Sequence, residues 1–309
     1  MPNWGEVLNE INQLKNGHAV ASNAAPDTIR RNHLKLLHEH TGRNVIAYYS
    51  GFLSKPDAPS DMNDEDKNGF MMAVHQLNRK LGLDIILHTP GGGIAAVQSL
   101  VNYLHKMFGA NIRAIVPQIA MSAGTMLACS CKSILMAKHS NLGPIDPHLS
   151  GMPAYGVIEE FKRACKEIKE DPSKLDMWRS IIGQYKPTFL GQCQNAIKWS
   201  NEFVQRELES VMFNGKSDAA KKAVRIVKQL TDYKANRTHE RHISSEECKS
   251  MGLIIEDIEE DPTLQDRLLT VHHCYMHSLM NTNAYKMIEN HLGVAFVKQQ
   301  AQIMVPVRQ

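Results

Sequence analysis

Two strand-turn-helix segments restrict the folds open to this chain most strongly. In the first, residues 83–87 form a short apolar run typical of a buried strand, and Pro90 with the three following glycines ends it. From Ile94 the apolar residues recur at helical spacing as far as Phe108. A chain that turns tightly from a buried strand into an amphipathic helix is typical of an α/β protein.

The second segment carries a serine at the same kind of junction. Residues 112–116 form another apolar run, Pro117 ends it, and small residues surround Ser122 before an apolar stretch resumes. A serine in this setting is open to a substrate carbonyl, and the N–H that follows it points toward the same oxygen. Serine is also a favoured helix N-cap, and a lone serine here is more often a cap than a nucleophile.

The glycine-rich turn at 90–93 supplies the complementary chemistry. Glycine allows positive φ angles and close approach of a ligand to the backbone. The unpaired N–H groups at the start of a helix favour negative charge, as the oxyanion of an acyl-transfer reaction requires. A short glycine motif alone more often marks a phosphate-binding or merely tight turn. Together the two segments predict an oxyanion hole and its nucleophile.

Strand-like runs alternate with helical stretches along much of the chain. The runs at 45–49, 83–87, 112–116 and 134–136, with a last one at 253–255, predict a parallel α/β core. Helical spacing dominates 6–15, 26–40 and 151–232. We expect an N-terminal helical extension (1–40), a core (41–262) that includes the helical segment 151–232, and a C-terminal helical extension (263–309).

Five sequence blocks follow one another in a specific order, at residues 44–51, 88–92, 116–118, 120–125 and 142–147. They resemble the Clp/crotonase fold and, more closely, the serine proteases of the serine dehydrogenase proteinase (SDH) family. The resemblance extends from about Asp27 to the segment after Gly252, and five ordered blocks are more specific than any single motif. It implies an α/β fold of stacked ββα units and a serine-type endopeptidase that forms an acyl-enzyme.

The resemblance implies roles for individual residues in the two turns. Ser122 stands at the position of the nucleophile. Gly91 or Gly92, with the N–H of Ala123, stands at the oxyanion hole. A helical segment such as 151–232 lies over the active site and joins subunits in related folds.

The base that activates the serine has three candidates. The family is described as using serine, aspartate and histidine in that chain order, which implies Asp146 as the acid and His239 as the base. Asp146 itself falls near the position where a Clp protease carries its histidine, and His148 lies two residues on, so His148 ranks second. A lysine ranks third, because peptidases of the signal-peptide class on this fold use a Ser-Lys pair; the candidates are Lys162, Lys174 and Lys186. A base needs hydrogen-bond reach to the serine and a third group that orients it.

Composition favours a soluble enzyme. A formal net charge of +3 over 309 residues is too balanced for a dedicated nucleic-acid binder. The six scattered cysteines predict reduced thiols in a cytoplasmic protein. We find no apolar signal core at the start and no apolar run of the length of about eighteen residues that a membrane span requires.

Neither a metal nor a cofactor is expected. His273 and His277 form a possible i, i+4 pair of ligands, but no carboxylate motif like that of zinc proteases accompanies them. The pattern favours an ordinary amphipathic helix.

The expected partners are a polypeptide substrate, further copies of the chain in a symmetric homo-oligomer, and an ATPase or regulatory protein. Two other functions stay open. A crotonase-type acyl-CoA enzyme would hold a thioester enolate with the same paired N–H groups and would not need Ser122. A catalytically silent scaffold would use the fold alone.

Overall fold

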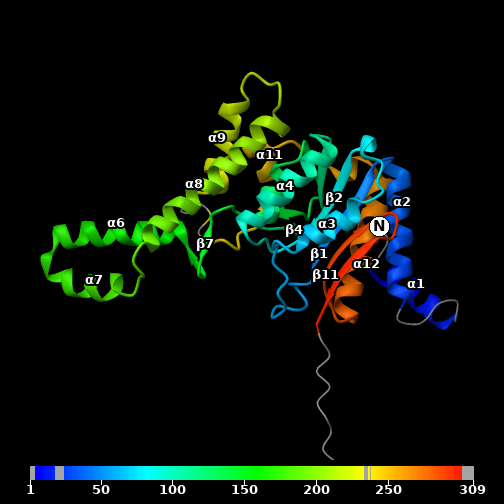
Figure 1. Ribbon diagram of the computed structural model, residues 1–309, viewed down its shortest axis with the longest axis horizontal. Coiled ribbons are helices and arrows are strands. Elements are labelled where there is room, and N and C mark those ends of the chain that lie inside the picture. Colours follow the sequence, from blue (N-terminus) through cyan, green and yellow to red (C-terminus); the bar gives the residue numbers. More distant parts are fainter. Residues whose placement is uncertain (1–3, 18–23, 233–235, 237, 301–309) are drawn as a thin grey trace, which may run out of the picture.

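The computed structural model describes residues 4–17, 24–232, 236 and 238–300. A seven-stranded sheet with the order β10-β5-β3-β2-β1-β11-β12 forms its centre (Figure 1). Five neighbouring strands run parallel: β1 (Asn44–Ser50), β2 (Leu83–His88), β3 (Ile112–Val116), β5 (Ser133–Met136) and β10 (Ile255–Asp257). The predicted parallel α/β core is therefore confirmed.

The C-terminal part corrects one expectation. Among the residues described after 261, only α12 (Pro262–Asn281) is helical, whereas β11 (Ala284–Asn290) and β12 (Ala295–Gln299) form an antiparallel hairpin that pairs with β1 through β11. The prediction of a helical extension is therefore wrong for 284–299. The strand pattern is hidden because the buried positions of β11 include Lys286 and Glu289, whose charges are paired with Asp66 and Arg30.

Helices cover both faces of the sheet. One face carries α3 (Asp66–Val74), α4 (Ile94–Phe108), α5 (Ala123–Cys129), the end of α8 (Phe189–Glu207), α9 (Ala219–Leu230) and α11 (Ser245–Met251). The other face carries α2 (Ala25–Thr41) and α12, with α1 (Trp4–Asn16) packed against them. Ile46 and Tyr48 of β1 face the first core, and Val45 and Ala47 face the second. A strand buried on both faces reads as a continuous apolar run, as β1 does.

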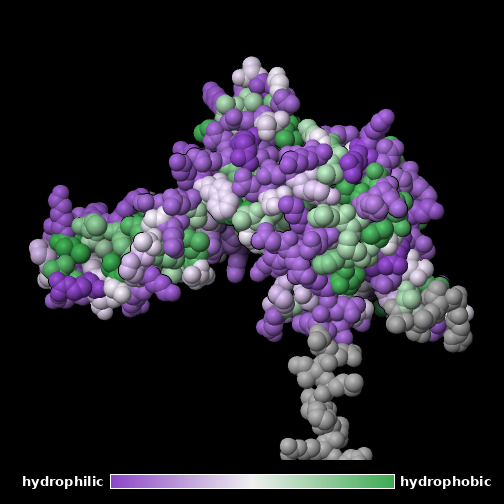
Figure 2. Space-filling model, in the orientation of Figure 1, coloured by the Kyte–Doolittle hydropathy of each residue, from purple (hydrophilic) through white to green (hydrophobic). Residues whose placement is uncertain are grey.

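A helical arm extends from the core. It consists of α6 (Ala154–Glu170), α7 (Leu175–Ile182) and the start of α8, with the short helix η2 (Pro172–Lys174) between α6 and α7 (Figure 1). The arm has a small apolar cluster of its own around Val157 and Phe189. Figure 2 shows apolar surface on the arm, and Leu175 and Met177 of α7 are exposed.

A second, three-stranded sheet joins distant segments of the chain. It contains β4 (Ile119–Ala120), β6 (Asn141–Leu142) and β9 (Ile243–Ser244). These strands lie just before Ser122, just before Asp146 and just after His239 in the chain, so their pairing draws three candidate segments together.

The remaining elements are short. They are the hairpin β7 (His148–Leu149) and β8 (Met152–Pro153), and the helices η1 (Arg79–Leu81), η3 (Leu208–Met212) and η4 (Ile258–Glu260). Within the part of the chain that the structure describes, no helix has the length and apolar character needed to cross a bilayer.

Candidate active site

Ser122 sits in a strained turn between β4 and α5. Its backbone has φ 49° and ψ −114°, a combination that residues with a side chain rarely adopt. Gly124 N–H donates to the Met121 carbonyl at 2.7 Å and Met126 N–H donates to the Ser122 carbonyl at 3.0 Å, which holds the turn in place. The Ser122 side chain does not cap α5. Ser122 therefore occupies the N-cap position without a capping bond from its side chain, and the strain is typical of a nucleophile elbow.

The glycine turn lies directly against this serine. The Met121 N–H donates to the Thr89 carbonyl at 3.0 Å, which ties the end of β2 to the segment before Ser122. A Cβ atom placed on Gly91 would be 2.6 Å from the Ser122 Cβ and 3.0 Å from the Ala123 nitrogen. Only a residue without a side chain permits this close approach.

The backbone N–H groups of the turn differ in their partners. Gly91 N–H donates to the Thr89 hydroxyl at 3.1 Å. Gly92 forms a parallel bridge with Met62, in which Met62 N–H donates to the Gly91 carbonyl at 2.7 Å. Since the residues on either side of Gly92 make the bridging bonds, its own N–H points to the opposite side. Among the described residues, no group accepts from the N–H of Gly92 or of Ala123.

Replacing Gly92 by alanine is expected to lower the free energy of unfolding by about 2–4 kcal/mol. An added Cβ would lie 2.2 Å from the Met62 carbonyl oxygen, and φ is 155°, so the backbone has to shift. Urea denaturation measures the effect. Gly191→Ala in α8 is the matched control, because a Cβ there meets nothing within 4 Å. Equal stability of the two variants would contradict the close packing of the turn.

A buried ion pair secures the segment that contains Met62. The Lys286 ammonium, fully buried on β11, lies 2.8 Å from the Asp66 carboxylate and donates to the Asp61 carbonyl at 2.6 Å. Tyr48 donates a further hydrogen bond to Asp66 at 2.8 Å. Buried charges persist only when they are paired and hydrogen-bonded, so this network fixes the loop that flanks the glycine turn.

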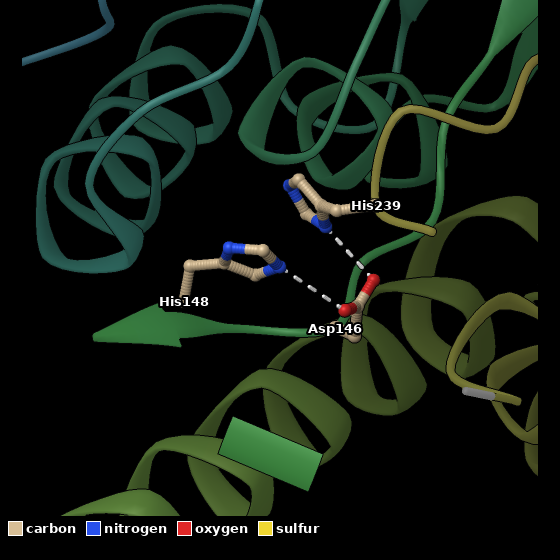
Figure 3. A group of neighbouring side chains, drawn as sticks. All are labelled: Asp146, His148 and His239. Atoms are coloured by element: carbon tan, nitrogen blue, oxygen red, sulfur yellow. Dashed lines mark hydrogen bonds and ion pairs between the residues drawn. The ribbon is translucent and has the colours of Figure 1, made fainter. Parts of the chain in front are cut away.

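Asp146 contacts two histidines, through a hydrogen bond with His239 and a longer contact with His148. His239 Nδ1 lies 2.8 Å from Asp146 Oδ1, and His148 Nε2 lies 3.4 Å from Asp146 Oδ2 (Figure 3). The centroids of the two imidazole rings are 4.2 Å apart. Each histidine directs its second ring nitrogen away from Asp146 (Figure 3). From the sequence, His239 and His148 are alternative candidates for the base, whereas in the structure both lie against the Asp146 carboxylate.

The loop that carries Asp146 is held by the elements around it. Gly143 N–H donates to the Thr125 hydroxyl at 3.0 Å, which links this loop to α5 and hence to the serine turn. Ile145 accepts from the Ser200 hydroxyl at 2.9 Å and donates to the Leu230 carbonyl at 3.1 Å, which links it to α8 and to the end of α9. The position of Asp146 relative to α5 is therefore fixed from three sides.

One cleft of about 500 Å³ holds these groups. Ser122, Gly92, His148 and His239 all line it, together with apolar side chains of α4, α5 and α8. Within the described residues, Ser122 makes no hydrogen bond to either histidine. Such bonds are often long or absent in a free enzyme and tighten with substrate.

The three lysines considered from the sequence lie elsewhere. Lys162, Lys174 and Lys186 belong to the arm, and none of them is among the described residues that line the cleft. Lys162 pairs with Glu159 and Lys174 with Glu167.

The pKa of Asp146 is lowered. Burial is the largest single influence and by itself would raise this pKa, but the hydrogen bonds from His148 and His239 and the charges of these residues together lower it to about 2. A folded pKa below the ordinary value of 3.8 means that the carboxylate stabilises the fold above about pH 4.

We therefore expect wild-type protein to lose stability relative to Asp146→Asn as the pH falls from about 4 to about 2. The difference is at most about 2 kcal/mol, because each pKa unit is worth about 1.4 kcal/mol and solvent in the cleft screens part of it. Urea denaturation of both proteins in chelator-containing buffer measures it. A constant difference across this range would contradict the lowered pKa.

Two features of the site were not predicted from the sequence. One is the network of Lys286 and Asp66, for which a lysine within the strand-like run at 284–288 was the available signal. The other is the bridge of Met62 to the glycine turn, for which the sequence gives no signal. On α12, His277 contacts the Trp4 carbonyl at 3.1 Å, in agreement with an ordinary packed helix.

Two features define the ClpP-like class of α/β proteins. A glycine turn at the end of a parallel strand packs against a strained serine, and an arm of helices follows that serine in the chain. The chain belongs within this class to the family of ClpP-like SDH-type serine proteinases, whose sequence model matches residues 30–272. The resemblance inferred from the five sequence blocks is thereby confirmed. The hairpin β11–β12, which carries Lys286, lies outside the matched segment.

Two uncharacterized proteins of Methanocaldococcus jannaschii are similar to this chain. One is 29% identical over 192 residues and the other 26% identical over 189 residues. The matches cover 62% and 61% of this chain but 59% and 57% of the relatives' own lengths.

Proposed function

We propose that this chain is an endopeptidase that hydrolyses peptide bonds through a Ser122 acyl-enzyme. The observation that carries the proposal is that the strained Ser122 lines the same cleft as His239, which is hydrogen-bonded to Asp146. Membership of a serine proteinase family supports a polypeptide as the substrate. Backbone strain at the half-buried Ser122 has a cost in stability that a purely structural turn does not need.

His239 is the proposed base and Asp146 the group that orients it. His239 faces Asp146 through Nδ1, so an Nδ1–H donated to the carboxylate leaves the lone pair of Nε2 for the serine proton. The shorter distance to the carboxylate, 2.8 Å against 3.4 Å, favours His239 over His148. Asp146 is almost fully buried, which suits a carboxylate that stays ionised and holds a base.

The reaction then follows from these positions. Ser122 Oγ attacks the substrate carbonyl carbon while its proton passes to His239, and the carbonyl oxygen becomes an oxyanion. The N–H groups of Gly92 and Ala123 stabilise that oxyanion. The C–N bond breaks as His239 gives its proton to the leaving amine. Water, deprotonated by His239, attacks the acyl-enzyme and restores the serine.

Of the glycines, Gly92 is the proposed donor and Gly91 the residue that allows close approach. The N–H of Gly91 is engaged by the Thr89 hydroxyl, whereas that of Gly92 points away from Met62. Donors fixed before the reaction cost no reorganisation when charge develops.

A fluorophosphonate probe tests the proposal. We expect covalent labelling of wild-type protein at Ser122, located by peptide mass spectrometry, together with cleavage of an unfolded protein substrate. Labelling without cleavage of any peptide would support another acyl hydrolase. Binding of CoA esters without labelling would support the crotonase-type alternative. A protein that is not labelled and does not bind CoA esters would support the scaffold alternative.

The assembly and setting are also part of the proposal. Exposed apolar side chains on the arm, Leu175 and Met177, support a homo-oligomer, which analytical ultracentrifugation tests. An ATPase or regulatory partner and a cytoplasmic location stay predictions.

A further inference from the structure

The catalytic scheme leaves one side chain of the cleft without a role. A serine-histidine-carboxylate mechanism needs one imidazole on the carboxylate, yet Asp146 holds two. The side chains of His148 and His239 are 32% and 22% exposed, so both are open to solutes from the cleft. An imidazole duplicated on a carboxylate is the donor set of a transition-metal site.

We propose that Asp146, His148 and His239 bind a divalent transition-metal ion, represented by Zn²⁺, and that the bound ion switches off Ser122. The second half of this statement rests on the proposed serine peptidase function; the first half does not. Each residue offers one ligand atom, and these three atoms lie within 4.8 Å of one another. It is the one group of this kind within the part of the chain that the structure describes.

The geometry needs little adjustment to accept an ion. The ligand atoms already converge because both imidazoles face the same carboxylate (Figure 3). An ion between these atoms would replace the hydrogen bond of His239 and the longer contact of His148 with two metal–nitrogen bonds and one metal–oxygen bond. Water from the open cleft supplies the fourth position of a tetrahedral ion.

Charge and ligand type indicate which ions are favoured. Asp61 is the one acidic residue among the described residues that line the cleft, and no lysine or arginine is among them. Two imidazoles with one carboxylate suit zinc and its neighbours in the first transition row. Calcium and magnesium prefer a set made of oxygen atoms alone, so they should bind much more weakly.

Binding would stop catalysis for a direct chemical reason. His239 would ligate the ion through Nδ1, the nitrogen that faces Asp146, so the neutral ring would hold its proton on Nε2 and lose the lone pair that takes the serine proton. A ligating Asp146 would also no longer accept the hydrogen bond that orients the ring. Ser122 then has no base, although its own position is unchanged. Removal of the ion by a chelator restores the base.

The first measurement is zinc binding, which does not depend on activity. Titration calorimetry with zinc chloride should show one ion per chain for wild-type protein and for Ser122→Ala. His148→Ala and Asp146→Asn should bind zinc weaker by about 100-fold or more, because each loses one of three ligands. His75→Ala is the matched control, since His75 is exposed at the end of α3, and it should bind as wild type does.

The second measurement is the rate of fluorophosphonate labelling. For each variant, the rate with zinc is divided by the rate without zinc, and these ratios are compared. In wild-type protein zinc should lower this rate by about the fraction of sites filled, and a chelator should reverse the effect. In His148→Ala the ratio should stay near one at the same zinc concentration.

Equal zinc binding by wild type and His148→Ala would overturn the site. Tight binding in wild type without slower labelling would overturn its control of Ser122. Absence of labelling in every sample would overturn the peptidase proposal, while the calorimetry would still decide the metal site.

Discussion

Ser122→Ala is expected to abolish covalent labelling and to lower the rate of peptide hydrolysis by about a million-fold, because the nucleophile of the acyl-enzyme is gone. The same position carries strain, with φ 49° and ψ −114°. Ser122→Gly should be equally inactive but more stable than Ser122→Ala by about 1 kcal/mol, since glycine adopts these angles without steric cost. Urea denaturation and labelling with a fluorophosphonate, performed on both variants, separate the chemical role from the backbone role.

Ser250→Ala is the control for this pair, because Ser250 is an exposed serine on α11. It should label and hydrolyse as wild type does. Persistent labelling of Ser122→Ala would identify a different nucleophile. A Ser122→Gly protein less stable than Ser122→Ala would show that the turn is not strained.

The second large effect is expected at the base. His239→Ala should reduce kcat/KM by about 10⁴-fold, because the imidazole that lies 2.8 Å from Asp146 is the proposed base for the serine proton. His148→Ala should reduce it less than about tenfold, since the 3.4 Å contact of His148 with Asp146 leaves His239 in place. Initial rates with a peptide substrate in chelator-containing buffer, measured for both variants, give the comparison.

The double variant Ser122→Ala/His239→Ala supplies a further control. Residues that act as one unit are not additive, so the double variant should be no slower than Ser122→Ala. A large loss in His148→Ala with a small loss in His239→Ala would assign the base to His148. Circular dichroism and thermal unfolding confirm that each single variant is folded before rates are compared.

Local chemistry made the first half of the site predictable. Contiguous residues encode a strand, a turn and a helix at 83–108 and again at 112–128. The apolar runs and glycines of these segments therefore predict that Ser122 and Gly92 lie at helix starts. The same reasoning misassigned 284–299. Lys286 and Glu289 are polar residues at buried strand positions, and their partners lie more than two hundred residues earlier in the chain.

The sequence by itself determined the parallel α/β core and the pair of turns, because both depend on the order and spacing of neighbouring residues. Only the tertiary structure decided which groups meet. Asp146 and His239 are 93 residues apart and come together because β6 pairs with β9. The placement of His239 on the Asp146 carboxylate, and of Met62 against the glycine turn, results from packing between separate segments, for which local spacing carries no signal.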